Sequence, residues 1–332
     1  MKRITYKAVL CLLLVQGVLS QSYGQVINIV TTAVPFLRIS PDARAGGMGD
    51  VGIATLPDAN SSFWNQAKIP FASSATSLAV NYTPWLKDIA PDVYLATLGG
   101  YHQLDEEQAI SASLRYFNLG EIQFVDNSGN LLNKSRPREV AFDIGYSRKV
   151  SEKIGVGVAL RYINSNLANG SFNGVSYKAG STVAADFSLF SNGLDDEGAG
   201  VTWGVTLSNL GGKIGYTNDA QAKDFIPANL GAGLGYTWVF DETSQFTLSA
   251  DINHLMVPTA PVSTGDETQD SILLQDYRNS SVFESWFKSF NNKAYTFAAG
   301  AEYTYNNQFS IRAGYFYEGK SQGGRRFFTA GV

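Results

Sequence analysis

The sequence has 332 residues, a formal net charge of −4 and only 16% charged residues, against about 25% in an average soluble domain. The small negative charge argues against a nucleic-acid-binding protein, so no nucleic-acid partner is expected. Glycine accounts for 33 residues and aromatic residues for 13%, and no apolar run long enough for a membrane helix follows Gln25. This composition excludes helical membrane spans and is compatible with a membrane β-barrel.

Residues 1–24 have the pattern of a cleaved secretory signal peptide. A positively charged start, "MKR" with Lys7, precedes the apolar stretch "AVLCLLLVQGVL", and small residues at 22–24 precede Gln25. We therefore predict export, with the mature chain beginning near Gln25. Cys11, the only cysteine, lies within the apolar stretch, so disulfides and cysteine-based metal chemistry are not expected in the mature protein. Export without disulfides favours a bacterial envelope protein.

Residues 25–75 are rich in Gly, Pro and Asn and show no regular hydrophobic period. A segment of this length ahead of a barrel commonly enters the lumen, so we predict an N-terminal plug. It contains the spacing G-x-G-x-x-G at Gly47, Gly49 and Gly52, which also occurs in dinucleotide-binding turns.

A dinucleotide-binding turn follows a buried strand, opens a helix and has an acidic residue about 20 positions later. Here Pro41 and Pro57 interrupt both flanking elements, and "IPFASS" near position 70 contains no acid. We therefore reject nucleotide binding and expect the glycines to let the plug pack its backbone closely against the barrel wall. Arg44 and Asp50 flank them, and we expect these two to pair with lumen charges such as Asp143 or Arg161.

From residue 76 to residue 332 the hydrophobic period is two, as in β-strands. Most of the alternating runs have 10–12 residues, whereas soluble strands average about 5–6 residues and tilted bilayer-spanning strands about 9–11. We count eleven runs, and a twelfth begins at Arg326: 76–84, 92–103, 108–118, 138–150, 154–165, 180–190, 200–210, 229–240, 244–256, 293–305 and 308–318. A soluble β-sandwich or propeller is the alternative, but it does not explain the strand length.

The connections also alternate in length, as the short periplasmic turns and long external loops of outer-membrane barrels do. The long ones are 119–137, 166–179, 211–228 and 257–292. One face of each run is apolar and the other carries charges of both signs, which would be costly in contact with lipid. We therefore assign these charged residues to the lumen, where we expect them to pair: Arg115, Asp143, Arg161, Asp186, Asp251, Glu302 and Arg312.

The loop 257–292 contains "NSSVFESWFKSF", in which Ser280 or Ser281 and Glu284 have the spacing of a helix-capping box. A short amphipathic helix is predicted there. Its apolar side suggests either a loop packed across the barrel mouth or a docking surface. The candidate docking residues are Phe283, Trp286, Phe287 and Phe290.

Two blocks carry a family resemblance. "PDARAGGMGDVGIATLPDANSSFWNQAKI" (41–69) and "LSNLGGKIGYTNDAQAKDFIPANLGAGLGY" (207–236) resemble FadL-like outer-membrane barrels of the PorV/PorQ family. "VPFLRISPDARAGGMG" (34–49) and "GEIQFVDNSGN" (120–130) are similar to its PorV (LptO-type) branch in particular. One departure is Gln66, where the family usually has proline. The plug motif comprises Arg44, Gly46, Gly47, Met48, Gly49, Asp50, Trp64 and Asn65.

The resemblance implies an integral outer-membrane protein of the type IX secretion system. Such a protein binds cargo with C-terminal signal domains as it leaves an SprA/Sov-type translocon barrel. It then delivers the cargo to a surface attachment complex that contains a PorU-type sortase. The other expected contact is with outer-membrane lipid, including LPS, and the family is also associated with LPS O-deacylation. The alternative is a FadL-like transporter of hydrophobic compounds.

The family barrel implied by the resemblance has fourteen strands, whereas the chain stops at "RRFFTAGV" inside its twelfth run. An open sheet edge is not tolerated in lipid. We therefore expect the sequence to lack about two strands; closure by another chain is the alternative.

Enzymatic signatures are absent from the sequence. The two histidines, His102 and His254, lie far apart, and no Ser-His-Asp arrangement, phosphate-binding loop or H-E-x-x-H motif is present. We predict no catalytic residue, no metal site and no cofactor.

Overall fold

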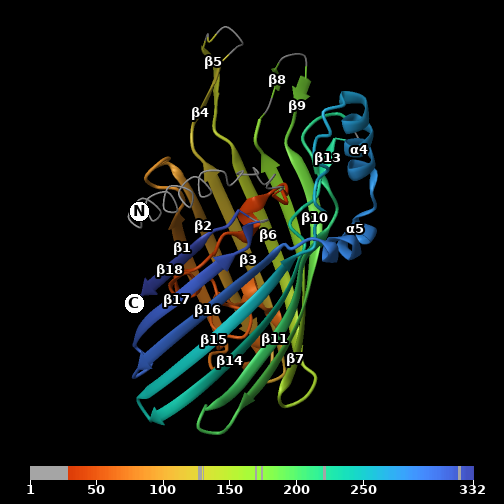
Figure 1. The fold of residues 1–332 in the computed structure, drawn as a ribbon. Helices are drawn as coiled ribbons and strands as arrows, with labels where there is room; N and C mark the ends of the chain where they lie inside the picture. Colours follow the sequence, from red (N-terminus) through yellow and green to blue (C-terminus); the bar gives the residue numbers. More distant parts are fainter. Residues whose placement is uncertain are drawn as a thin grey trace, which may run out of the picture.

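The computed structural model describes residues 29–125, 129, 131–168, 170–172, 175–219, 222–320 and 323–332 (Figure 1). The predicted signal peptide lies outside these residues. Twelve strands form one antiparallel sheet in which each strand pairs with its neighbours in chain order. They are β1 (Thr76–Pro84), β2 (Val93–Gln103), β3 (Gln108–Leu119), β6 (Arg138–Lys149), β7 (Ile154–Asn166), β10 (Gly180–Leu194), β11 (Gly200–Gly211), β14 (Asn229–Asp241), β15 (Ser244–Leu255), β16 (Tyr295–Tyr305), β17 (Phe309–Glu318) and β18 (Arg326–Gly331).

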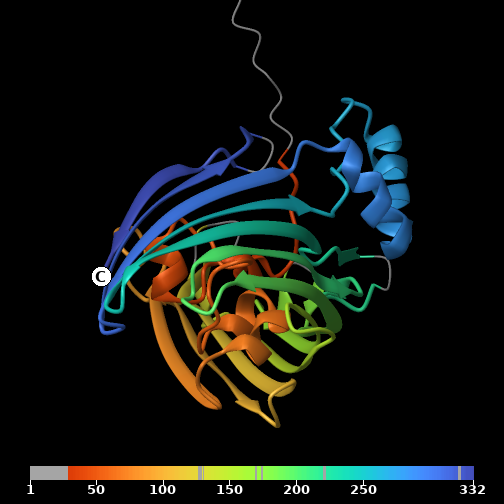
Figure 2. The ribbon, with the colours of Figure 1, turned by 90° about the horizontal axis from the view of Figure 1, so that it is seen from below.

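Each predicted run coincides with one of these strands, so the all-β class is confirmed. The period of two also assigns the faces correctly. On β6, Phe142 and Ile144 are exposed on the outer face, whereas Asp143 between them is buried on the inner face. The sheet curls around the N-terminal segment (Figure 2), with β1 and β18 at the two ends of the strand order.

Three small hairpins extend the long connections at one end of the sheet, here called the long-loop end (Figure 1). They are β4–β5 (Ile122–Val125 and Leu131–Ser135), β8–β9 (Gly170–Phe172 and Val175–Tyr177) and β12–β13 (Ile214–Gly215 and Lys223–Asp224). Tight turns join the strands at the other end. Asn306 and Asn307 form one of them, between β16 and β17. Both have a left-handed backbone conformation, which asparagine tolerates better than most residues.

The N-terminal segment forms short helices inside the curled sheet (Figure 2). They are η1 (Pro35–Arg38), α2 (Ala43–Gly47), α3 (Ser61–Trp64) and η2 (Gln66–Phe71). Asp42 caps α2, since its side chain accepts a hydrogen bond from the Ala45 amide. α2 lies against β17 and β18, whereas η2 lies against β6, β7 and β10. The plug thus spans the lumen and contacts distant parts of the wall.

The connection from β15 to β16 contains α4 (Glu267–Asn279), α5 (Val282–Lys288) and η3 (Ser289–Asn291). Asp266 caps α4 by accepting hydrogen bonds from the amides of Thr268 and Gln269. Both helices lie outside the ring of strands (Figure 2). Among the described residues, no helix is both long enough and apolar enough to cross a membrane.

Candidate functional site

Glycines bring the plug backbone into direct contact with β17. A Cβ added to Gly314 would lie 2.1 Å from the carbonyl carbon of Met48, and one added to Gly49 would lie 2.7 Å from the amide nitrogen of Tyr315. Gly49 also has a φ of +74°, which other residues rarely adopt. Beside this contact, Thr329 of β18 donates a hydrogen bond to the Gly47 carbonyl at 2.9 Å.

Arg44 connects the plug to the wall through ion pairs. Its guanidinium contacts Glu302 of β16 at 2.7 Å and Asp58 of the plug at 3.0 Å, and Glu302 also accepts a hydrogen bond from Arg312 at 2.6 Å. Arg44 thus pairs with one of the predicted lumen charges, but the named partners, Asp143 and Arg161, are wrong. Those two residues lie on β6 and β7, whereas α2 lies against β17 and β18.

Asp143 and Arg161 instead pair with each other. Arg161 also contacts Asp186 at 2.8 Å, and Arg115 contacts Asp143 at 3.4 Å. The cluster contains two cations and two carboxylates, so its formal charges balance. Six of the seven predicted lumen charges are therefore paired across adjacent strands. Asp251 is the exception, because its carboxylate accepts hydrogen bonds from the plug amides of Gly52 and Ile53 instead. Asp50, expected to join such a pair, lies at the cavity described below.

Trp64 and Asn65 form hydrogen bonds within the plug, and Asn65 also forms one to the wall. The Trp64 indole nitrogen donates a hydrogen bond to the Asp42 carboxylate at 2.7 Å. The same carboxylate caps α2 by accepting a hydrogen bond from the Ala45 amide. The Asn65 amide donates to the carbonyl of Ile53 in the plug and to that of Leu189 in β10, at 3.0 and 3.1 Å. A side chain at Gly52 would collide with the Trp64 ring, at 2.1 Å.

Sequence reasoning did not single out Lys68 and Gln66 as contacts, although both are buried. The Lys68 ammonium donates to the Gly52 carbonyl and to both oxygens of Thr55, at 2.8–3.3 Å. Gln66, the departure from the family pattern, accepts a hydrogen bond from Ser111 of β3 at 2.7 Å. The sequence carries no signal for their burial, because the plug has no hydrophobic period that would mark an inner face.

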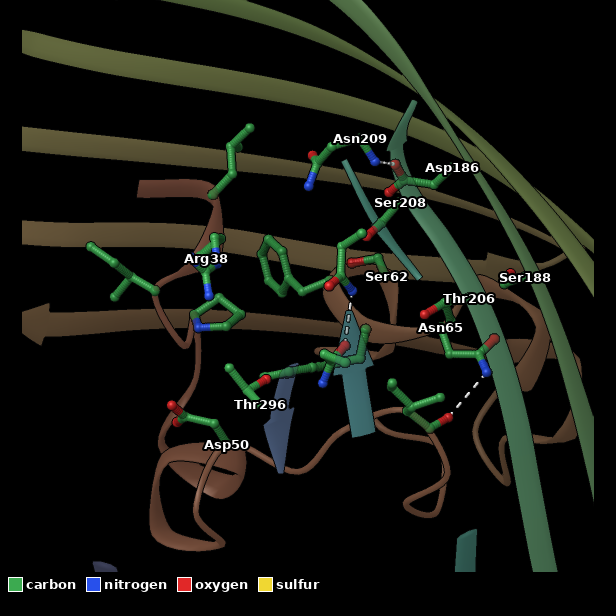
Figure 3. A pocket seen from close by; sticks show the side chains of 18 of the residues that line it. Arg38, Asp50, Ser62, Asn65, Asp186, Ser188, Thr206, Ser208, Asn209 and Thr296 are labelled. Atoms are coloured by element: carbon green, nitrogen blue, oxygen red, sulfur yellow. Dashed lines mark hydrogen bonds between the residues drawn. The ribbon is translucent and has the colours of Figure 1, made fainter. Parts of the chain in front are cut away.

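A small cavity of about 140 Å³, lined by both polar and apolar side chains, lies between the plug and the wall (Figure 3). Arg38, Asp50 and Asn65 of the plug and Asp186 and Thr206 of the wall are among the side chains that line it. A space of this size, with several polar side chains around it, suits a few water molecules. Its volume lies below the roughly 300–1,000 Å³ that is typical of ligand pockets.

A larger cavity, of about 540 Å³, lies at the long-loop end, and we call it the mouth cavity. Its lining combines apolar residues with the charged residues Glu139, Asp224 and Arg278, and it includes α4 and the segment 31–35. Burial raises the pKa of Tyr216 and of Tyr277 to about 12, so both phenols stay neutral at physiological pH. The lining residues of the mouth cavity come mainly from the long loops that we expect to bind partners.

The predicted aromatic helix is α5, and the structure places it against the outer wall. The ring of Phe290 stacks on His254 of β15 at 4.9 Å, and His254 packs on Tyr295 of β16 at 4.5 Å. His254 shares the outward face of β15 with Ile252. Of the two interpretations of this loop, packing across the mouth does not describe α5, although α4 borders the mouth cavity.

Ser289 and His254 form a buried contact of 3.5 Å that invites comparison with a catalytic pair. The Ser289 hydroxyl, however, donates to the Trp286 carbonyl at 2.6 Å, so its proton is directed away from the imidazole. A nucleophilic serine requires the opposite arrangement. Within the described part of the chain, no group of three or more His, Cys, Asp or Glu residues could hold a metal ion.

Comparisons with known proteins agree with this architecture. The family model described as "Type IX secretion system protein PorV" matches residues 22–262. A solved structure, the TodX deltaS2S3 mutant monoaromatic hydrocarbon channel, is 12% identical, with a TM-score of 0.50 over 85% of this chain and 84% of its own. At this identity the likeness concerns the fold, and it confirms the predicted FadL-like barrel with an N-terminal plug.

Two further solved structures are similar. The toluene transporter TodX of Pseudomonas putida is 13% identical, with a TM-score of 0.48 over 88% of this chain and 85% of its own. A FadL homologue of Pseudomonas aeruginosa is 10% identical, with a TM-score of 0.39 over 91% of this chain and 96% of its own. No curated protein matches the sequence.

Proposed function

Because the chain belongs to the PorV family and is thus a component of type IX secretion, we propose that it is the outer-membrane shuttle of that system. In this role it binds the C-terminal signal domain of cargo leaving an SprA/Sov-type translocon barrel. It then delivers the cargo to the attachment complex with its PorU-type sortase. The family match over residues 22–262 is the observation that carries the proposal.

The state of the lumen supports a binding role over a transport role. The plug is joined to the wall by ion pairs and by backbone contacts at glycines, and the space beside it is small. A FadL-like transporter of hydrophobic compounds, the alternative function, needs an apolar path through this region. The proposed binding surface is therefore external, on the loops 119–137, 166–179, 211–228 and 257–292 around the mouth cavity.

An effect on LPS O-deacylation would be indirect under this proposal. A deacylase needs a nucleophile and a base that reach a lipid ester. Ser289 and His254 are both buried, and the serine proton is directed to a carbonyl. We accordingly propose a non-enzymatic protein.

Affinity purification of the intact protein from its own membranes tests the proposal. We expect a large translocon barrel and a sortase to co-purify with it. In a strain lacking the gene, cargo with signal domains should stay in the periplasm or in the translocon. Normal surface display of cargo in that strain would rule the shuttle out.

Two α4 variants test the assignment of cargo binding to the mouth cavity. Leu274 lines the cavity, whereas Ile272 lies on the same helix and is not among the lining residues. Leu274→Asp places a charge in the proposed interface and should weaken binding of a purified signal domain about tenfold or more. Ile272→Asp should leave binding unchanged. Equal binding by both variants would show that the signal domain binds elsewhere than at this cavity.

A further inference from the structure

The helix α5 and the turn η3 carry an exposed aromatic flank on the outer side of the barrel. Phe283, Phe287 and Phe290 are 64%, 61% and 48% exposed. The rings of Phe283 and Phe287 pack edge to face at 5.1 Å. A group of large apolar side chains that is exposed on a monomer surface marks a site of contact with a membrane or with another protein.

The residues of α5 and the first two residues of η3 divide into three sectors around the helix axis. Ser285 and Ser289 are fully buried and face the protein. Phe283, Phe287 and Phe290 follow the i, i+4, i+7 spacing that places residues on one side of a helix. Glu284 and Lys288 form an exposed i, i+4 ion pair of 2.7 Å on the flank beyond them. One flank is thus aromatic and the other charged, while a third side is fixed to the wall.

The aromatic flank is continuous with the lipid-facing surface of the sheet. Phe290 stacks on His254, which packs on Tyr295, and both lie on the outward faces of their strands. Ile252 follows on the same face of β15 and Phe297 on that of β16, and both are exposed. In a barrel these outward apolar positions contact acyl chains. The helix lies beside the long-loop end of these strands (Figure 1), where the apolar band meets water.

From this continuity we infer that α5 and η3 form an interfacial anchor. The aromatic flank lies in the membrane leaflet nearest the long-loop end, at the boundary between the lipid headgroups and the acyl chains. Glu284 and Lys288 face water. Amphipathic helices with aromatic and charged sides bind bilayer surfaces in this way. The anchor would fix α4, which borders the mouth cavity, at a set height above the membrane.

Site-directed spin labelling tests the depth of each flank. Cys11 is the only cysteine, so Phe287→Cys, Glu284→Cys and Phe297→Cys can each be labelled alone in a Cys11→Ser background. The full chain is placed in vesicles of phosphatidylethanolamine and phosphatidylglycerol. Collision of the nitroxide with oxygen, which concentrates in lipid, is compared with collision with a water-soluble nickel chelate.

At position 287 we expect oxygen collisions to exceed nickel collisions several-fold, as at the lipid-facing control position 297. Position 284 should show the reverse. A label at 287 that behaves like the one at 284 overturns the proposal, and so does exclusion of both reagents, which would indicate that position 287 is buried in protein. Phe283→Cys carries the same test if Phe287→Cys does not fold. No cargo takes part, so the result is independent of the proposed shuttle function.

Discussion

Arg44 of the plug and Glu302 of β16 form a two-point ion pair, with Nη2–Oε1 at 2.7 Å and Nε–Oε2 at 3.1 Å, although 258 residues separate them. Glu302 is nearly inaccessible, and it also binds Arg312. A single carboxylate therefore holds one guanidinium of the plug and one of the wall. Two-point pairing fixes direction as well as distance, so it orients α2 against the sheet.

Glu302→Gln should destabilise the folded barrel strongly. The change removes the negative charge and leaves two guanidinium groups without their shared partner, and breaking a buried ion pair costs about 3–5 kcal/mol. The urea midpoint for loss of the heat-modifiable band on gels should fall accordingly. Glu107→Gln is the matched control, because its pair with Arg148 is exposed and such pairs contribute little. Equal midpoints for the two variants would contradict the proposed role of Glu302.

Gly314→Ala should impair packing of the plug. The added methyl group would lie 2.1 Å from the backbone of Met48, and overpacking of a filled site costs about 1–3 kcal/mol or more. Gly49→Ala should be at least as harmful because of its positive φ. The measurement is the yield of folded protein recovered from membranes.

Gly46→Ala is the control for the glycine series, since its added Cβ would meet only the Ser40 hydroxyl, at 3.9 Å. Full recovery of Gly46→Ala with loss of the other two would locate the close contact at β17. Normal recovery of Gly314→Ala would mean that the plug can move away from the wall.

Trp64→Phe separates the hydrogen bond of this residue from its packing. Phenylalanine retains most of the ring but leaves the buried Asp42 carboxylate without the indole donor, a loss worth about 1–3 kcal/mol. The urea midpoint should fall less than for Trp64→Ala. Trp203→Phe, on the partly exposed outer face of β11, should leave the midpoint unchanged. A similar fall for both phenylalanine variants would show that the Asp42 contact contributes nothing specific.

Lys213→Met should loosen the C-terminal end of α4. The Lys213 ammonium donates to the carbonyls of Arg278 and Ser280 at 2.6 and 2.7 Å, and such carbonyls at a helix end need external donors. Hydrogen exchange at residues 276–280 should become faster, while exchange within β15 stays unchanged. The exposed Lys87→Met serves as the control. Unchanged exchange at 276–280 would show that water replaces the lysine without cost.

The sequence by itself determined the strands and their faces. A period of two over about ten residues can bury charges and expose apolar residues in only one way, since shifting by one residue reverses every side chain. Phe142 and Asp143 therefore face opposite sides whatever the loops do. The prediction that the glycine motif binds no nucleotide has a similarly local basis, because Pro41 and Pro57 interrupt the strand and the helix that such a turn requires.

Only the tertiary structure decided which residues meet. The plug has no period, so nothing in its sequence specifies which strands it touches, and Arg44 pairs with Glu302 rather than with Asp143. The position of α5 was open for the same reason. Its aromatic spacing predicts an apolar side, but only the stacking of Phe290 on His254 shows that the helix lies beside the outer wall. Strand register follows from local alternation, whereas contacts between an irregular segment and a sheet depend on where the whole chain brings them together.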